Sequence, residues 1–127
     1  MTTKRKIVII EDDRETCEEL RELLQSEGYS VRAALNGLEG LALVQKQSCD
    51  LLLLDLKLPG LDGEGVLERL SAEGPKPKVL VVTARSLNGD LAEESPVGKP
   101  GWELVSDVVS KPFDIADLLA EVKRLLA

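Results

Sequence analysis

The sequence of 127 residues predicts an α/β fold, a doubly wound sheet of five parallel strands in a single domain spanning residues 1–127. Two observations predict it. Short apolar runs alternate with segments of helical periodicity, which is typical of βα units around a parallel sheet. The run Leu51–Leu54 is four consecutive leucines, the pattern of a central strand buried on both faces. Asp55 follows at once, and in such folds ligands gather where the strands end.

The first half of the chain contains two expected strand–helix units before the leucine strand. Residues 7–10 predict a strand, and a helix follows to about residue 27, where glycine stops it. The inner face of that helix is expected to carry Cys17, Leu20, Leu23 and Leu24. Residues 30–35 alternate only weakly, which suits a strand at the edge of the sheet. Asn36 is expected to cap the next helix. The apolar positions of that helix are Leu38, Leu41 and Ala42.

The second half is expected to supply the remaining strands and helices. A helix with Val66, Leu67 and Leu70 follows the leucine strand, and residues 79–82 and 104–109 predict two more strands. The last helix has Asp114 as its cap. Its apolar stripe follows the spacing of one helix face and consists of Ile115, Leu118, Leu119, Val122, Leu125 and Leu126. Five strands and about five helices result.

The connection between the fourth and fifth strands departs from regular helix chemistry. Residues 86–102 contain an Asn-Gly pair, two prolines and two further glycines, which break helices. Only residues 91–94, approximately, could form a helical turn. The sequence therefore predicts an irregular or shortened fourth helix.

Composition excludes several classes of function. The chain has no histidine, so it cannot carry Ser-His-Asp or Cys-His catalysis or a phosphohistidine of its own. Cys17 and Cys49 are too few for a disulfide framework or a zinc site, and we assign both to packing. A formal net charge of −7 argues against a nucleic-acid surface. Because the chain has neither a long apolar span nor a signal peptide, we expect no membrane partner and a cytoplasmic location.

Polar side chains follow four of the expected strands. In chain order they are Glu11, Asp12 and Asp13, then Asp55, Thr83 and Lys111. The carboxyl ends of parallel strands meet at one edge, so these groups are expected to converge. Clustered carboxylates repel one another unless a cation lies among them, and oxygen ligands suit Mg²⁺. A metal ion and a lysine beside a carboxylate are what phosphoryl transfer needs, with Asp55 as the nucleophile.

Each of these residues also has an ordinary structural interpretation. An aspartate after a strand is more often a helix cap than a ligand, and this holds for Asp12 and Asp13 taken alone. Taken alone, Thr83 is more often a helix cap, and Lys111 is more often a solvated surface lysine. Asp62 and the glycine after it are interpreted as turn chemistry. The convergence of four strand ends favours function.

The motifs around these residues resemble the receiver domain of bacterial two-component response regulators, the family of the single-domain chemotaxis regulator. The matching segments are Ile-Ile-Glu11-Asp12, Leu-Asp55-Leu-Lys57-Leu-Pro-Gly, Val-Val-Thr83-Ala and Ser-Lys111-Pro-Phe. The resemblance covers nearly the whole chain. It implies the flavodoxin-like strand order 2-1-3-4-5 and a signalling domain that assists its own phosphorylation and dephosphorylation, not an enzyme acting on a separate substrate.

The resemblance also implies a role for each matching acid. Asp55 would accept a phosphoryl group from a histidine kinase or a histidine phosphotransfer protein. Mg²⁺ would be held by Asp12 directly, by Glu11 through water, by Asp55, and by the backbone carbonyl of Lys57. Asp13 matches a position that is not a ligand in the family.

Two further residues would act on the phosphoryl group itself. Thr83 and Lys111 would each contact a phosphoryl oxygen after transfer. The peptide bond between Lys111 and Pro112 would be cis. The signal would pass to an output protein or domain through a change at the surface.

The chain departs from the family pattern at the position three residues before Lys111. Receivers carry tyrosine or phenylalanine there, and this chain has Val108. The coupling of threonine to an aromatic side chain therefore cannot operate in its ordinary form. This departure favours an alternative, a pseudo-receiver that docks partners without phosphorylation. A phosphatase with an aspartyl-phosphate intermediate is a third reading, disfavoured because Lys57 stands where those enzymes carry a second acid.

Overall fold

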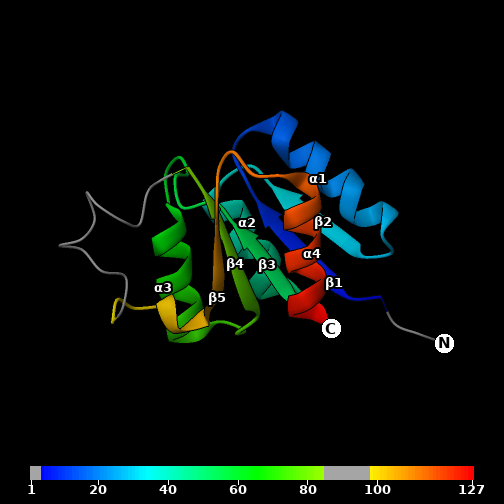
Figure 1. The fold of residues 1–127 in the computed structure, drawn as a ribbon. Helices are drawn as coiled ribbons and strands as arrows, with labels where there is room; N and C mark the ends of the chain where they lie inside the picture. Colours follow the sequence, from blue (N-terminus) through cyan, green and yellow to red (C-terminus); the bar gives the residue numbers. More distant parts are fainter. Residues whose placement is uncertain (1–3, 85–97) are drawn as a thin grey trace.

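The computed structural model describes residues 4–84 and 98–127, and these form a five-stranded parallel sheet (Figure 1). The strand order is β2-β1-β3-β4-β5, so the predicted fold and order are confirmed. The leucine strand is central and the weakly alternating strand lies at an edge, both as expected. The strands are β1 (Lys6–Ile10), β2 (Ser30–Ala34), β3 (Leu51–Leu54), β4 (Lys78–Thr83) and β5 (Val105–Ser110).

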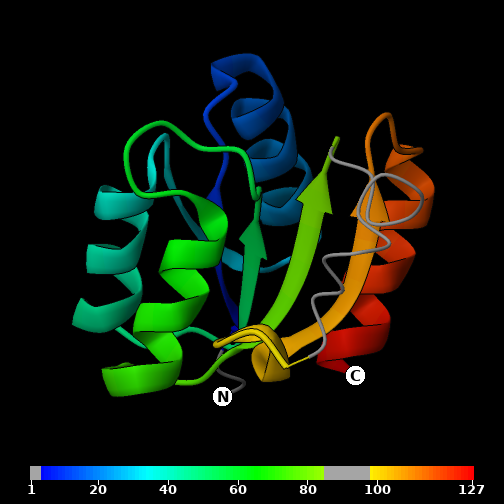
Figure 2. The same cartoon turned by 90° about the vertical axis from the view of Figure 1, so that its left-hand side faces the viewer.

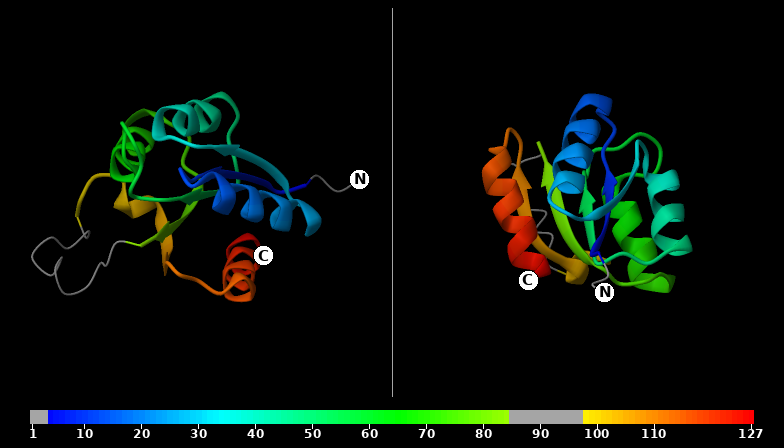
Figure 3. Two further views of the ribbon diagram at one scale, coloured as in Figure 1. Left: turned by 90° about the horizontal axis from the view of Figure 1, so that it is seen from above. Right: turned by 90° about the vertical axis from the view of Figure 1, so that its right-hand side faces the viewer.

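Helices cover both faces of the sheet (Figures 2 and 3). One face packs against α1 (Arg14–Ser26) and α4 (Ile115–Leu126), the other against α2 (Gly37–Lys46) and α3 (Gly63–Glu73). A short 3₁₀ helix, η2 (Trp102–Leu104), leads into β5. The described residues thus contain four α-helices. The predicted helical turn at residues 91–94 lies outside them.

The leucine run is buried on both faces because two separate apolar clusters share it. Leu51 and Leu53 join the cluster beneath α1 and α4, whereas Leu52 and Leu54 join the cluster beneath α2 and α3. All four side chains are at most 2% exposed. Burial on two faces explains why this strand shows no alternation of apolar and polar residues.

The face of α2 differs from the prediction. Asn36 does cap this helix, accepting a hydrogen bond from the Glu39 N–H at 2.9 Å. Leu38, however, is 59% exposed and Ala42 is exposed as well. The buried positions are Gly37, Gly40, Leu41 and Val44. A Cβ atom on Gly40 would lie 2.3 Å from Ile10, so glycine lets the helix approach the sheet closely. Counting apolar residues alone misses such a face.

Three smaller expectations also need correction. In α4 the buried stripe begins at Leu118, because Ile115 lies in the first turn and is 43% exposed. The fifth strand starts at Val105, since Leu104 ends the 3₁₀ helix. Asp62 does more than form a turn: its carboxylate caps α3 by accepting the Gly65 N–H at 2.8 Å.

Within residues 4–84 and 98–127, no helix has the length and apolar character needed to cross a membrane.

Candidate functional site

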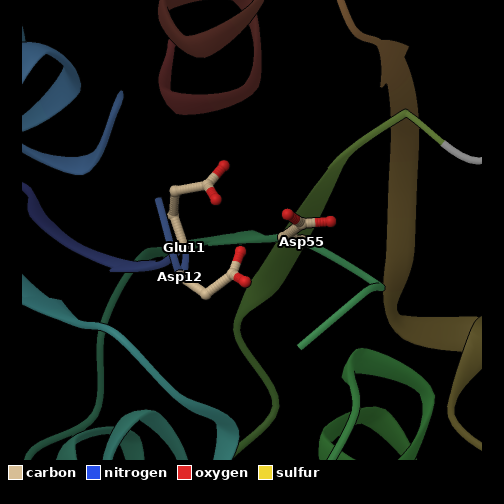
Figure 4. A group of neighbouring side chains, drawn as sticks. All are labelled: Glu11, Asp12 and Asp55. Carbon is tan, nitrogen blue, oxygen red and sulfur yellow. The ribbon is translucent and has the colours of Figure 1, made fainter. Parts of the chain in front are cut away.

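The predicted cluster of acids lies at the carboxyl end of the sheet. Glu11 and Asp12 follow β1, and Asp55 follows β3. Figure 4 shows the three side chains directed toward a common region. One carboxylate oxygen from each residue lies within 4.8 Å of the other two. Because carboxylate oxygens are the ligands that Mg²⁺ prefers, this donor set fits that ion.

Backbone pairing brings the two strand ends together. Ile10 lies opposite Leu54 in the parallel register, and the Asp55 N–H donates to the Ile10 carbonyl at 3.0 Å. The loop after Asp55 is held from the other side by Gly63, whose N–H donates to the Leu56 carbonyl at 2.9 Å. A Cβ on Gly63 would lie 2.4 Å from the Asp55 carbonyl oxygen. Only glycine therefore fits where α3 begins against the site.

Asp55 is a nearly buried carboxylate with a donor on each oxygen. Its side chain is 7% exposed. Oδ1 accepts the Lys57 N–H at 3.1 Å, and Oδ2 accepts the Lys111 ammonium at 3.1 Å. Its position is thus set by β3, by the following turn, and by a residue that comes 56 positions later in the chain.

Lys111 joins Asp55 to Glu11. Its ammonium donates to Glu11 Oε1, while Glu11 Oε2 accepts the Asp13 N–H at 3.0 Å. Burial raises the pKa of Glu11 above its ordinary value, and the bond to Lys111 only partly offsets this. Burial lowers the pKa of Lys111, but its bonds to Glu11 and Asp55 outweigh burial and leave that pKa above the ordinary value.

The remaining predicted residues lie around this core. Thr83 is fully buried at the end of β4, and its carbonyl accepts the Lys111 N–H at 2.9 Å. The bond between Lys111 and Pro112 is cis, as predicted. Asp13 caps α1 by accepting the Thr16 N–H at 3.1 Å. This contact agrees with the interpretation of Asp13 as a helix cap.

Val108 occupies the position where the family carries an aromatic residue. It lies on β5 opposite Val81, half-buried, and packs against the apolar cluster beneath α2 and α3. The one tryptophan, Trp102, packs against the same cluster from the 3₁₀ helix that precedes β5.

Sequence reasoning missed three features of the site. These are the close packing of Gly63, the Lys57 N–H as a donor to Asp55, and the Asp13 N–H as a donor to Glu11. The Asp-Gly pair at residues 62–63 was a signal for the first, but it is equally typical of an ordinary turn. The two backbone donors leave no trace in side-chain identity.

Comparison with known proteins identifies the family. The model of the response regulator receiver domain matches residues 7–123. This chain belongs to that family. The resemblance drawn from the strand-end motifs is therefore confirmed, and the family is one of signalling domains. Response regulators act together with histidine kinases and output domains.

Individual relatives agree with this assignment. The chain is 37% identical over 123 residues to the uncharacterized transcriptional regulatory protein YkoG of Bacillus subtilis (strain 168). The matched region covers 97% of this chain and 51% of YkoG. The chain spans about half the length of the curated relatives it matches.

Solved structures match over almost the whole fold. A CheY-like receiver domain protein from Methanospirillum hungatei JF-1 has a TM-score of 0.84 at 28% identity, covering 98% of this chain and 94% of that one. The response regulator TrrA from Thermotoga maritima, solved in complex with Mg²⁺-BeF, has a TM-score of 0.78 at 28% identity, covering 95% and 98% of the two chains.

Proposed function

We propose that this receiver domain is a phosphoacceptor of a two-component phosphorelay and that Asp55 takes the phosphoryl group. The donor is a histidine kinase or a histidine phosphotransfer protein. The observation that carries the proposal is the arrangement of Glu11, Asp12 and Asp55 within 4.8 Å, with the Lys111 ammonium bonded to Asp55. Phosphoryl transfer requires this combination of a nucleophilic carboxylate, a metal-binding set of oxygens and a cation.

The transfer forms one bond and breaks one bond. A carboxylate oxygen of Asp55 attacks phosphorus while the phosphorus–nitrogen bond of the donor phosphohistidine breaks. The donor imidazole leaves with the electron pair of that bond and takes up a proton from solvent. In this proposal Thr83 and Lys111 each contact a phosphoryl oxygen, the buried threonine as a hydroxyl donor and the half-buried lysine as a cation.

Asp12, Asp55, Glu11 and the backbone carbonyl of Lys57 would hold Mg²⁺. When bound, Mg²⁺ neutralises charge on the phosphoryl oxygens and on the attacking carboxylate. The chemistry of the donor set supports this assignment because the side-chain groups are all carboxylates, and the relative TrrA was solved with Mg²⁺-BeF.

Output passes through a surface change to a partner protein or domain, since the full-length relatives are about twice as long as this chain. The proposal includes a cytoplasmic location, because the proposed phosphodonor would act there. Val108 favours a second candidate, a pseudo-receiver that docks its partners without phosphorylation, because the aromatic side chain of the common switch is missing.

The experiment is an intact-mass measurement after incubation with a small-molecule phosphodonor. With Mg²⁺ the wild-type chain should gain one phosphoryl group, and with a chelator in place of Mg²⁺ it should gain much less. Asp55→Asn should gain none under either condition. A folded wild-type chain that gained nothing in Mg²⁺ would contradict the proposal and favour the pseudo-receiver.

A further inference from the structure

Residues 98–104, which we call the strap, lie along α3 and end in the 3₁₀ helix η2 (yellow in Figures 1 and 2). The strap and the helix meet at three places, one on each of three successive turns of α3. The contacts are Lys99 Nζ with Glu64 Oε2 at 3.7 Å, Gly101 with Leu67, and a carboxylate oxygen of Glu103 with Ser71 Oγ. Because the contacts follow the same order in both segments, the strap runs along the helix.

The middle contact brings backbone onto backbone. Gly101 has a φ of 92°, and a Cβ atom on it would lie 2.4 Å from the carbonyl carbon of Leu67. Both the left-handed backbone and the short distance favour glycine. Because no flexible side chain lies between the two backbones, a displacement of α3 at Leu67 displaces the strap with it.

The residue after Gly101 is Trp102, the one tryptophan of the chain. Its ring packs against the apolar cluster beneath α2 and α3. Its indole N–H is buried and has no acceptor within residues 4–84 and 98–127. A buried donor without an acceptor costs about 1–3 kcal/mol. A small movement of the strap that lets this N–H reach water recovers the cost, so a second position of Trp102 lies close in free energy.

The first residue of α3 contacts the turn that carries Asp55. The Gly63 N–H donates to the Leu56 carbonyl at 2.9 Å, and a Cβ on Gly63 would lie 2.4 Å from the Asp55 carbonyl oxygen. Leu67 comes four residues later, about 6 Å along the helix axis. One helix therefore contacts the Asp55 turn at its first residue and the strap one turn later.

We propose that the strap is a switch element that responds to Asp55 through α3, with Trp102 as the aromatic side chain that changes its environment. The inference rests on the proposed function, because it takes Asp55 as the residue that is modified. The Asp55 carboxylate accepts the Lys57 N–H at 3.1 Å. A phosphoryl group adds charged oxygens beside this N–H, so the turn adjusts and moves the start of α3.

The strap then follows α3 at Gly101, and the Trp102 N–H comes to donate to water. Phosphorylation thereby favours the second position of Trp102, which is a shift between two states of the fold. Such a switch needs no aromatic side chain at position 108.

The fluorescence of the full 127-residue chain tests this inference, because all of the tryptophan emission comes from Trp102. Mg²⁺ with beryllium fluoride, which imitates an aspartyl phosphate, is the probe. In wild type we expect the emission to move to longer wavelength and the indole N–H signal in nuclear magnetic resonance to move downfield. Asp55→Asn with the same additions should show neither change.

Two glycine substitutions test the route through α3. Gly98 has a φ of 90°, and a Cβ on it would have no atom of the described residues within 4 Å. Gly98→Ala and Gly101→Ala therefore place a side chain on similarly left-handed backbone, but only the second pushes the strap away from Leu67. Gly101→Ala should lose most of the emission shift, whereas Gly98→Ala should keep it. Both variants should still gain a phosphoryl group in the mass measurement.

The outcomes separate this inference from the proposed function. An unmoved Trp102 signal in a wild-type chain that gains a phosphoryl group would contradict the inference and leave the proposed function standing. A full emission shift in folded Gly101→Ala would contradict the route through α3. A wild-type chain that gained no phosphoryl group would overturn the proposed function, and this inference with it.

Discussion

Each end of the central strand β3 carries an aspartate, and the two aspartates have different hydrogen-bond and ion-pair partners. Asp50 lies just before the strand and Asp55 just after it. Asp50 is tied to backbone: its carboxylate accepts the Lys6 N–H at 2.7 Å, and its own N–H donates to the Lys6 carbonyl at 2.8 Å. Arg5 lies 3.8 Å from its other oxygen. Through these hydrogen bonds, Asp50 joins the start of β1 to the start of β3.

A lysine at the same amino end of the sheet is also used structurally. Lys78, at the start of β4, donates from its side chain to the Leu125 carbonyl at 2.7 Å. That carbonyl belongs to the last turn of α4, where carbonyls have no partner within the helix and a cation is favourable. Charges at this end therefore satisfy backbone groups that the fold leaves open.

The carboxyl end is organised differently. There the acids Glu11 and Asp55 meet one another and share a single lysine, Lys111. Like charges placed together destabilise a fold unless something compensates them. The two ends therefore differ in what their acids share: Asp50 joins two strands through the backbone, whereas Glu11 and Asp55, which also accept backbone N–H groups, meet around one lysine and form a site.

The largest expected effect that sharpens this comparison is on metal binding. Asp12→Ala removes an exposed carboxylate of the acid cluster. We expect the affinity for Mg²⁺, measured by titration calorimetry, to fall by about a hundredfold or more, because hard cations depend on charged oxygen ligands. Asp50→Ala is the control and should leave that affinity unchanged. Equal losses in the two variants would erase the distinction between the two ends.

The next effect is on folding. Asp50→Ala should lower the free energy of unfolding by about 1 kcal/mol, the ordinary net worth of a hydrogen bond, because the Lys6 N–H loses its acceptor. Urea denaturation measures it. A variant as stable as wild type would show that water replaces the carboxylate as the acceptor of the Lys6 N–H, and that Asp50 does not stabilise the contact between β1 and β3.

A smaller and pH-dependent effect is expected at the start of α1. Hydrogen bonds from Thr16 hold the pKa of Asp13 below its ordinary value. The stability that this cap contributes is therefore fully present above the ordinary aspartate pKa and is lost as the pH falls through the lowered one.

Asp13→Ala should lower the Tm by a few degrees at neutral pH, as losing a helix cap does. The difference from wild type should shrink as the pH is brought below about 4. A difference in Tm that stayed constant down to pH 2 would argue against the carboxylate as the cap.

The smallest effect concerns the two cysteines. Burial raises the pKa of the Cys49 thiol to about 11 and also raises that of Cys17. Since the thiolate is the reactive form, neither residue should react appreciably with a thiol reagent at pH 8 in the folded protein. Both should react in urea. Rapid modification of the folded chain would show that these cysteines are more than packing residues.

Much of the fold and site could be predicted from sequence because the relevant signals are local. The leucines of β3 predict a strand buried on both faces, and the acids that follow the strands predict a shared location at the carboxyl edge of the sheet. The strand order came from the resemblance, since periodicity does not order strands. The predicted inner face of α2 was wrong because only apolar residues were counted. Gly40 is not hydrophobic, yet it packs against Ile10.

The pairing of Glu11 with Lys111 could not be foreseen in the same way. The two residues are 100 positions apart, and the resemblance assigned one to the metal and the other to the phosphoryl group. Only the folded arrangement shows that the two side chains contact each other. Sequence thus indicates which groups share an edge, whereas the bonds among them depend on distances that the register and the loops set.

The most direct test of the account compares the two ends of β3 in one measurement. Wild type, Asp50→Asn and Asp55→Asn would be incubated with Mg²⁺ and a small-molecule phosphodonor, and their intact masses recorded. We predict one added phosphoryl group on wild type and on Asp50→Asn, and none on Asp55→Asn. A phosphoryl group on folded Asp55→Asn, or its loss from folded Asp50→Asn alone, would contradict the assignment of the site to the carboxyl end of the sheet.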